Sequence, residues 1–383
     1  MARLWYDARL RAATIQIAVL GLAGLLALWL ATNTAENLAR RGIAVGFDFL
    51  SRVARFPISE SLIAYAPSDT FARAFAVGLV NTLFIAGIIV VGSTILGLFV
   101  GLARRSQHPL AFGIATVFVE TMRNTPLVVQ LLFWYALVTV GLPNVRQALN
   151  PLPGTFLSVR GLFVPSLHVG GSPAILWTIL LVGIVVIVIA SAVGRRKRVR
   201  TGHGFPYGSI AAAAMATGLG ATWIAGLWSV SVDTPRLQGF SFVGGTALTP
   251  EFASLVVGMV LYSSCFIGEI IRGGIDAVGK GQWEAGRSVG LSERQSLRLV
   301  VIPQALRVII PPMTSQYFNI VKNTTLALVV GYPDISYVVA TTINQTGQAI
   351  EGVLILMAVF LTISAAISLF MNWYNRKVAL VQR

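Results

Sequence analysis

The chain has 383 residues, of which 55% are hydrophobic and 11% are charged, and its mean hydropathy is +0.76. Soluble domains contain about 45–50% apolar and about 25% charged residues, so this composition excludes a soluble enzyme, a disordered chain and a coiled coil. The net charge of +15 would suit a nucleic-acid binder, but in so apolar a protein positive cytoplasmic loops explain it better, and no nucleic-acid partner is expected.

Apolar stretches long enough to cross a bilayer predict eight membrane helices. Six of them contain no Asp, Glu, Lys or Arg: 12–31, 74–103, 174–194, 208–230, 252–268 and 352–375. Two further runs, 109–141 and 299–330, are interrupted by charged residues. We therefore expect an all-α, polytopic membrane helix bundle of about eight transmembrane helices.

The first span shares features with a signal peptide, because it follows a basic start and ends near small residues. Its apolar run is longer than the roughly 7–15 residues of a signal-peptide core, which favours a retained anchor. We assign 1–73 to this anchor and an extracytoplasmic loop, and 74–383 to a transmembrane domain. Within that domain, the fourth and fifth spans and their loops, at about 142–250, look like an inserted helix pair.

Basic clusters set the expected orientation. They precede the first span and follow the second, fourth, sixth and last spans. If the spans alternate in direction, all of these clusters lie on one side, which the positive-inside rule makes the cytoplasm. Both termini are then cytoplasmic. The loop 32–73 is a mild exception, because it carries five arginines on the opposite side.

The charged segment 281–303 predicts two short helices joined by a tight turn. The first helix ends at Gly290, a typical residue for terminating a helix. Ser292 and Gln295 have the spacing of a capping box that starts the second helix, and Pro303 is expected to kink or end it. Such a projection into the cytoplasm suits docking onto a soluble partner, although an ordinary loop with capped helices has the same pattern.

The spacing within this segment resembles the EAA loop of bacterial ABC importer permeases. The chain has Glu-Ala-Gly at 284–286 where the family has Glu-Ala-Ala, followed at the family spacing by a glycine and by Ile-Pro at 302–303. The resemblance implies that 280–303 is the coupling loop that docks on an ATP-hydrolysing subunit. The coupling residues carried over are Glu284, Ala285, Gly286, Gly290 and Pro303.

Other segments narrow the resemblance. Residues 120–130, 268–275 and 303–312 resemble the polar amino-acid permeases of the HisM/HisQ-like branch. Residues 316–327 and 331–334 resemble the general L-amino-acid permeases of the AapQ and BztB kind. The resemblance covers about 75–140 and 250–375, and it implies a type I ABC importer permease core of the MetI-like fold in the bacterial inner membrane.

The resemblance also implies the partners. The importer would contain two ATPase subunits, a second permease that is a different chain, and a periplasmic amino-acid-binding protein. The substrate would be an L-amino acid of polar or broad specificity, and the surroundings would be membrane lipid. ATP and Mg would bind to the ATPase partners, so the chain itself is expected to be a non-catalytic permease subunit without a cofactor.

Residues 274–281 match the first seven positions of a P-loop, but Gly281 stands where the magnesium-binding hydroxyl is needed. No nucleophile lies in a pattern with a base, so a hydrolase site is not expected. One cysteine and three histidines exclude an intrachain disulfide and argue against a metal site.

Polar residues inside two spans are candidates for a substrate path, because such groups are costly in lipid. They are Glu120, Arg123, Asn124 and Thr125 in one span, and Lys322, Asn323, Thr324 and Thr325 in another. Glu120 and Arg123 can pair at i,i+3, and Pro126 should interrupt the helix. We hypothesise that Arg123 or Lys322 faces a substrate carboxylate and Glu120 the ammonium group. A network that only fixes helix packing explains the pattern equally well.

Glu269 and Arg272 form another i,i+3 pair, interpreted as a structural clasp beside the coupling loop. Two other classes of protein stay open as alternatives. A secondary transporter driven by an ion gradient would show inverted repeats and acidic ion sites, and neither is visible. A structural or channel protein would not explain the spacing of the coupling loop.

Overall fold

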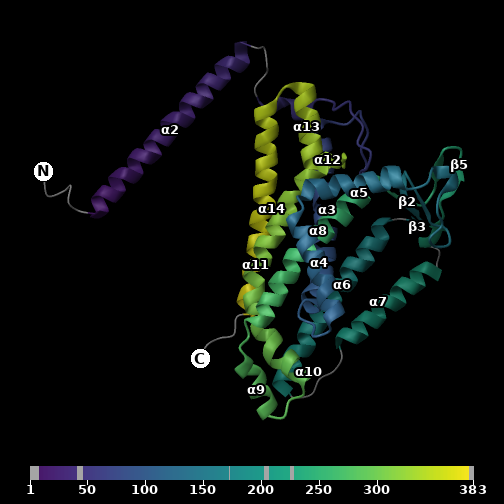
Figure 1. Ribbon diagram of the computed structural model, residues 1–383. Coiled ribbons are helices and arrows are strands. Elements are labelled where there is room, and N and C mark those ends of the chain that lie inside the picture. Colours follow the sequence, from purple (N-terminus) through teal and green to yellow (C-terminus); the bar gives the residue numbers. More distant parts are fainter. Residues whose placement is uncertain (1–7, 41–45, 172, 202–206, 225–227, 379–383) are drawn as a thin grey trace. The chain divides into compact units, whose positions relative to one another are not determined.

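The computed structural model describes residues 8–40, 46–171, 173–201, 207–224 and 228–378. The chain divides into two compact units, one formed by Met1–Trp134 and Ser254–Arg383 and the other by Tyr135–Ala253. Helices dominate both (Figure 1). The predicted helix bundle is confirmed, and short strands in the second unit add to it.

Among the described residues, five helical stretches are long and apolar enough to cross a membrane. They lie in α2 (Ala8–Arg40), α3 (Phe71–Ala103), α8 (Pro250–Asp276), the run from α10 (Glu293–Ser296) to α12 (Ala327–Val330), and α14 (Ala349–Val378). A sixth candidate is the pair α4 (Pro109–Asn124) and α5 (Leu127–Gly141), which is bent by 106°. The break follows from Pro126, which has no N–H to donate and disfavours a helical Thr125.

The remaining two predicted spans fall on α6 (Pro173–Thr201) and α7 (Tyr207–Ile224). Their described apolar parts, Leu181–Gly194 and Gly208–Gly220, are shorter than the roughly 20 residues that a span needs. By length and composition, the described residues thus supply five or six of the eight predicted spans. The prediction of helix up to residue 230 is wrong at its end, because β4 (Trp228–Asp233) begins there.

Helix α3 begins at a capped residue and crosses α8 closely. The side chain of Thr70 accepts a hydrogen bond from the Arg73 N–H at the start of α3. Farther along, a Cβ atom on Gly97 would lie 2.6 Å from Cγ2 of Ile267, and one on Gly101 would lie 2.6 Å from the Gly268 carbonyl oxygen. Glycines four residues apart therefore let the two backbones approach, as small residues do in membrane helix pairs.

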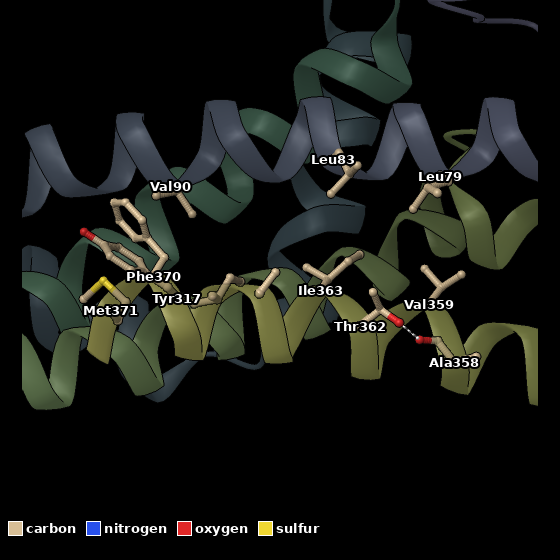
Figure 2. A pocket seen from close by; sticks show the side chains of 12 residues that line it. Leu79, Leu83, Val90, Tyr317, Ala358, Val359, Thr362, Ile363, Phe370 and Met371 are labelled. Carbon is tan, nitrogen blue, oxygen red and sulfur yellow. Dashed lines mark hydrogen bonds between the residues drawn. The ribbon is translucent and has the colours of Figure 1, made fainter. Parts of the chain in front are cut away.

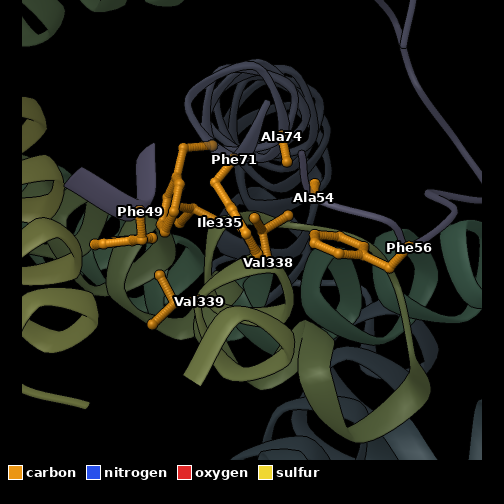
Figure 3. Close-up of a cluster of buried hydrophobic side chains, with 9 residues drawn as sticks. Phe49, Ala54, Phe56, Phe71, Ala74, Ile335, Val338 and Val339 are labelled. Carbon is orange, nitrogen blue, oxygen red and sulfur yellow. The ribbon is translucent and has the colours of Figure 1, made fainter. Parts of the chain in front are cut away.

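Residues 46–70, predicted only as part of a loop, contribute to a hydrophobic core. Aromatic side chains of this segment and of the start of α3 pack against α13 (Ile335–Thr346), a helix that the sequence did not predict (Figure 3). The cluster contains Phe49, Ala54, Phe56, Phe71, Ala74, Phe75, Ile335, Val338 and Val339. Burial of the aromatic rings in this cluster fixes 46–70 onto α3 and α13.

Short turns of 3-10 helix occur at Asp48–Ser51 and Val145–Gln147.

The described residues of the second unit contain seven short strands, which lie where the sequence predicted loops except for the start of β4. A three-stranded antiparallel sheet has the order β1 (Phe156–Ser158), β2 (Gly161–Val164) and β7 (Thr246–Leu248). Two further antiparallel pairs are formed by β3 (Ser166–Gly171) with β4, which follows α6 and α7 in the chain, and by β5 (Arg236–Gln238) with β6 (Ser241–Val243), which form a hairpin. Strands of three to six residues carry too little periodicity to be recognised in the sequence.

Candidate functional site

The segment 280–303 folds as two helices joined by a turn, as the sequence predicted. Helix α9 (Lys280–Ser288) ends before Gly290, whose φ of +81° suits glycine. The Ser292 side chain accepts from the Gln295 N–H at 3.3 Å, and Oε1 of Gln295 accepts from the Ser292 N–H at 2.9 Å. The predicted capping box at the start of α10 is therefore confirmed.

Pro303 has a different role from the predicted one. After α10 the backbone makes a π-helical turn, η3 (Leu297–Val301), and then continues as α11 (Ile302–Asn323). Pro303 lies in the first turn of α11, where its missing N–H costs no hydrogen bond. It therefore starts a helix rather than ending one, and α11 also accommodates two later prolines, Pro311 and Pro312.

The coupling residues carried over from the family differ in exposure. Glu284, Ala285 and Gly290 are exposed, whereas Gly286 is buried. A Cβ atom on Gly286 would lie 2.7 Å from the Ser296 hydroxyl oxygen, so glycine lets α9 and α10 pack closely. This contact gives a physical reason for glycine at the position where the family has alanine.

The predicted clasp between Glu269 and Arg272 is confirmed and belongs to a larger ion network. Arg272 contacts Glu269 at 3.0 Å and Asp276 at 3.2 Å, all within α8. Two arginines after the end of α3 complete it: Arg104 contacts Glu269 at 2.7 Å, and Arg105 contacts Asp276 at 2.9 Å. The sequence did not predict the two arginine contacts, because their partners lie more than 160 residues away.

The polar residues at the end of α4 do not form the predicted ion pair. Arg123 lies over the ring of Phe266, with its guanidinium carbon 5.4 Å from the ring centroid. The carboxylate of Glu120 instead accepts a long hydrogen bond, 3.5 Å, from the Asn124 side chain. Both charged side chains are exposed in the single chain. The predicted helix break at 124–126 is confirmed by the bend between α4 and α5.

The second polar group lies where α11 ends. A 3-10 turn, η4 (Thr324–Leu326), separates α11 from α12. The hydroxyl of Thr324 donates to the Val321 carbonyl, and that of Thr325 donates to the Lys322 carbonyl. The two threonines therefore cap the helix end, while Lys322 is exposed. Within the described residues, no hydrogen bond or ion pair joins this group to the one on α4.

An apolar groove of about 800 Å³ lies between α3, α11 and α14 (Figure 2). Its two hydroxyl groups already have partners: Thr362 donates to the Ala358 carbonyl at 2.7 Å, and Tyr317 shares a hydrogen bond with Thr94 at 3.2 Å. The groove offers no charged side chain to a zwitterion. Its chemistry suits an apolar occupant such as a lipid chain better than an amino acid.

The P-loop-like residues do not form a phosphate loop. Gly274 lies inside α8 and packs against Ile309, and Lys280 begins α9. The described part of the chain also has no group of three His, Cys, Asp or Glu side chains placed to hold a metal ion.

The chain belongs to the family described as binding-protein-dependent transport system inner membrane components, whose model matches residues 93–380. It is therefore a transport component with several membrane helices. It is 46% identical to the putative amino-acid ABC transporter permease protein YhdX of Escherichia coli K12, over 96% of this chain and 93% of that protein.

Two further relatives cover almost the whole chain. The general L-amino acid transport system permease protein AapQ of Rhizobium johnstonii is 39% identical over 99% of this chain and 94% of its own length. The permease protein BztB of Rhodobacter capsulatus, from a glutamate/glutamine/aspartate/asparagine transport system, is 34% identical over 100% of this chain and 97% of its own. The resemblance to amino-acid ABC permeases of the AapQ and BztB type is thus confirmed.

Proposed function

We propose that the chain is the permease subunit of an ATP-driven importer of L-amino acids with polar or broad specificity. The observation that carries this proposal is the α9–α10 loop, which presents Glu284, Ala285 and Gly290 at an exposed, capped turn. The relatives AapQ and BztB, named for amino-acid transport, support the choice of substrate class.

In this proposal the loop docks on an ATPase subunit, and two such subunits bind ATP and Mg. Their closure displaces α9 and α10, and the membrane helices then expose the transport path to a periplasmic binding protein. A second, different permease chain completes the path. Both termini of this chain lie in the cytoplasm, and the chain holds no cofactor of its own.

The exposed charges beside the two helix breaks are the candidates for the path. Arg123 and Lys322 could attract a substrate carboxylate, and Glu120 an ammonium group, since none of the three has an ion-pair partner within the described residues. Broken helices with polar residues are where transporters place their substrates. The threonine hydroxyls at 324 and 325 instead bond to the helix end, which supports the packing role for these two residues.

The first experiment tests docking by charge reversal. We expect Glu284→Arg to weaken copurification of the ATPase subunit by roughly tenfold or more, since like charges at a polar interface cost several kcal/mol. The matched control is Asp48→Arg, an exposed carboxylate on the predicted extracytoplasmic side, which should leave the complex intact. Equal ATPase recovery from both variants would overturn the docking role.

A second experiment tests the energy source. The reconstituted importer should hydrolyse ATP faster when the binding protein is loaded with amino acid, and uptake should require ATP. Uptake by the chain alone, driven by an ion gradient, would instead establish the secondary-transporter alternative.

A further inference from the structure

Besides its turn and packing against α10, the coupling helix α9 has three attachments to other elements among the described residues of its unit. It is joined to α8 by three residues, because α8 ends at Asp276 and α9 starts at Lys280. It is joined to α11 by a hydrogen bond of 3.0 Å between the side chains of Gln304 and Gln282. Its third attachment is Trp283, whose ring lies under the guanidinium of Arg105, 5.6 Å from the ring centroid.

Arg105 contacts two different elements at once. Its Nε donates to Oδ1 of Asp276 at 2.9 Å, at the end of α8, while its guanidinium carbon lies over the ring of Trp283 of α9, 5.6 Å from the centroid. A planar guanidinium can use its edge for a carboxylate and its face for an aromatic ring simultaneously, whereas a lysine ammonium cannot. Arg105 itself follows the C-terminal end of α3.

The neighbouring ion pairs have a more limited reach. Arg104 joins the end of α3 to Glu269 of α8, whereas Arg272 pairs only with acidic residues of its own helix α8, so neither arginine touches α9. Arg287 pairs with Glu293 at 2.7 Å inside the loop and does not reach α3. Within the described residues, the contact between Arg105 and Trp283 links α3 to α9.

We propose that Arg105 is a positioning residue that makes α3 follow α9 when the coupling loop moves. Movement of α9 reaches α8 through the chain and α11 through Gln282, but it reaches α3 through the Arg105–Trp283 stack. The inference rests on the proposed function, and it adds the route by which ATPase motion enters the first helix of the permease core.

The test uses the complete importer in proteoliposomes: this chain, its partner permease, the ATPase and the binding protein. The measured quantity is the number of substrate molecules transported per ATP hydrolysed. If Arg105 had a purely structural role, its substitution would leave this ratio unchanged in the complexes that still assemble. We expect Arg105→Ala and Trp283→Leu each to lower this ratio roughly fivefold or more, the low end of coupling between sites. ATP hydrolysis itself should continue.

Four variants make the test specific. Trp283→Phe keeps an aromatic face and should retain most of the ratio, whereas Arg105→Lys should fall with the alanine variant. The double variant Arg105→Ala/Trp283→Leu should have no lower a ratio than either single variant, because each single variant already removes the Arg105–Trp283 contact. Arg272→Ala breaks ion pairs within α8, outside the docking loop and without reaching α9, and should keep the wild-type ratio.

A distance measurement tests the link without relying on transport, so it also applies to variants whose transport is reduced for other reasons. Spin labels at Ser106→Cys and Ser288→Cys, in a Cys265→Ser background, report the separation of the ends of α3 and α9. We expect that separation to stay constant through the ATP cycle with Trp283 present and to vary with nucleotide in Trp283→Leu. A constant separation in both, or an unchanged transport ratio in Arg105→Ala, would overturn the link.

Different results would overturn the proposed function and the role of Arg105. If the wild-type complex shows no stimulation of ATP hydrolysis by the loaded binding protein, the proposed function fails. If the wild type is coupled and the Arg105 and Trp283 variants are equally coupled, only the role of Arg105 fails.

Discussion

The two ends of α3 are attached to their neighbours by different chemistry. Near its start, the Asn81 amide donates to the carbonyl oxygens of Glu60 and Pro333 at 2.8 and 2.9 Å, and it is 1% exposed. Beside it, the Thr82 hydroxyl oxygen accepts from the Ile335 N–H at 2.9 Å. At the far end, Arg105 and Asp276 form an ion pair with side chains 37% and 43% exposed.

The difference indicates which end can move. Breaking a buried amide contact leaves polar groups without water or protein partners, which is costly. An exposed ion pair can exchange its partner for water at little cost. The Asn81 end is therefore a fixed anchor, and the arginine end can move together with α9 during a transport cycle. Experiments that change each end separately test this contrast.

The largest expected effect concerns Asp334 at the fixed end. Its Oδ1 caps α13 by accepting from the Tyr337 N–H at 2.9 Å, and the residue is 0% exposed. Burial raises the pKa of this carboxyl from 3.8 to about 7, partly offset by hydrogen bonds from Tyr337 and Ser336. Between about pH 4 and pH 7, the folded state therefore still holds a proton on Asp334, whereas the unfolded state has already released it.

The contribution of Asp334 to the free energy of unfolding should accordingly be greatest below about pH 4 and should fall as the pH rises to about 7. At about 1.4 kcal/mol for each pKa unit, the loss is of the order of 2–4 kcal/mol. Asp334→Asn keeps a capping oxygen and should remove this decline, which unfolding midpoints at about pH 5 and pH 8 would measure. Asp48→Asn, at an exposed site, should leave it intact. A wild-type decline that persists in Asp334→Asn would contradict the assignment.

The next effect is the loss of the Asn81 contacts. Asn81→Leu leaves the carbonyls of Glu60 and Pro333 without this donor and should lower the free energy of unfolding by about 2–3 kcal/mol. Asn37→Leu is the control, because Asn37 is exposed and makes only a long side-chain bond to Asn33. Denaturant unfolding of the purified chain in detergent measures both. Similar stability of the two variants would show that the anchor does not depend on the buried amide.

A smaller effect is expected where α3 and α8 cross, between the two ends. In Gly101→Ala the new methyl group would meet the Gly268 carbonyl oxygen, so the helices must separate, at a cost of about 1–3 kcal/mol. Gly87→Ala, in the same helix, has nothing within 4 Å of its new Cβ atom and should be neutral or slightly stabilising. The same unfolding measurement compares them, and equal midpoints would mean that the crossing is not tight in the membrane.

Sequence reasoning succeeded where the cause is local. Ser292 and Gln295 lie three residues apart, so their capping box could be predicted, and so could the Glu269–Arg272 pair within one helix. The break at Pro126 follows from the geometry of proline alone.

Contacts distant in sequence could not be predicted in this way. The bond from Asn81 to Pro333 spans 252 residues, and no pattern in a single sequence indicates it. The expected Glu120–Arg123 pair was wrong because Phe266, on another helix, offers its ring to Arg123. Local spacing shows which contacts are possible, and tertiary packing decides between them.

The smallest expected effect on stability concerns the arginine end of α3. Arg105→Ala removes one ion pair and one aromatic contact, both half-exposed, and should cost only about 0.5–1 kcal/mol. Because salt screens exposed charges, this cost should shrink further at about 1 M salt, whereas the cost of Asn81→Leu should hardly change. Unfolding of both variants at low and high salt measures the contrast. If Arg105→Ala were as costly as Asn81→Leu and equally insensitive to salt, the arginine end would be an anchor too, and motion of the coupling loop would have to enter α3 elsewhere.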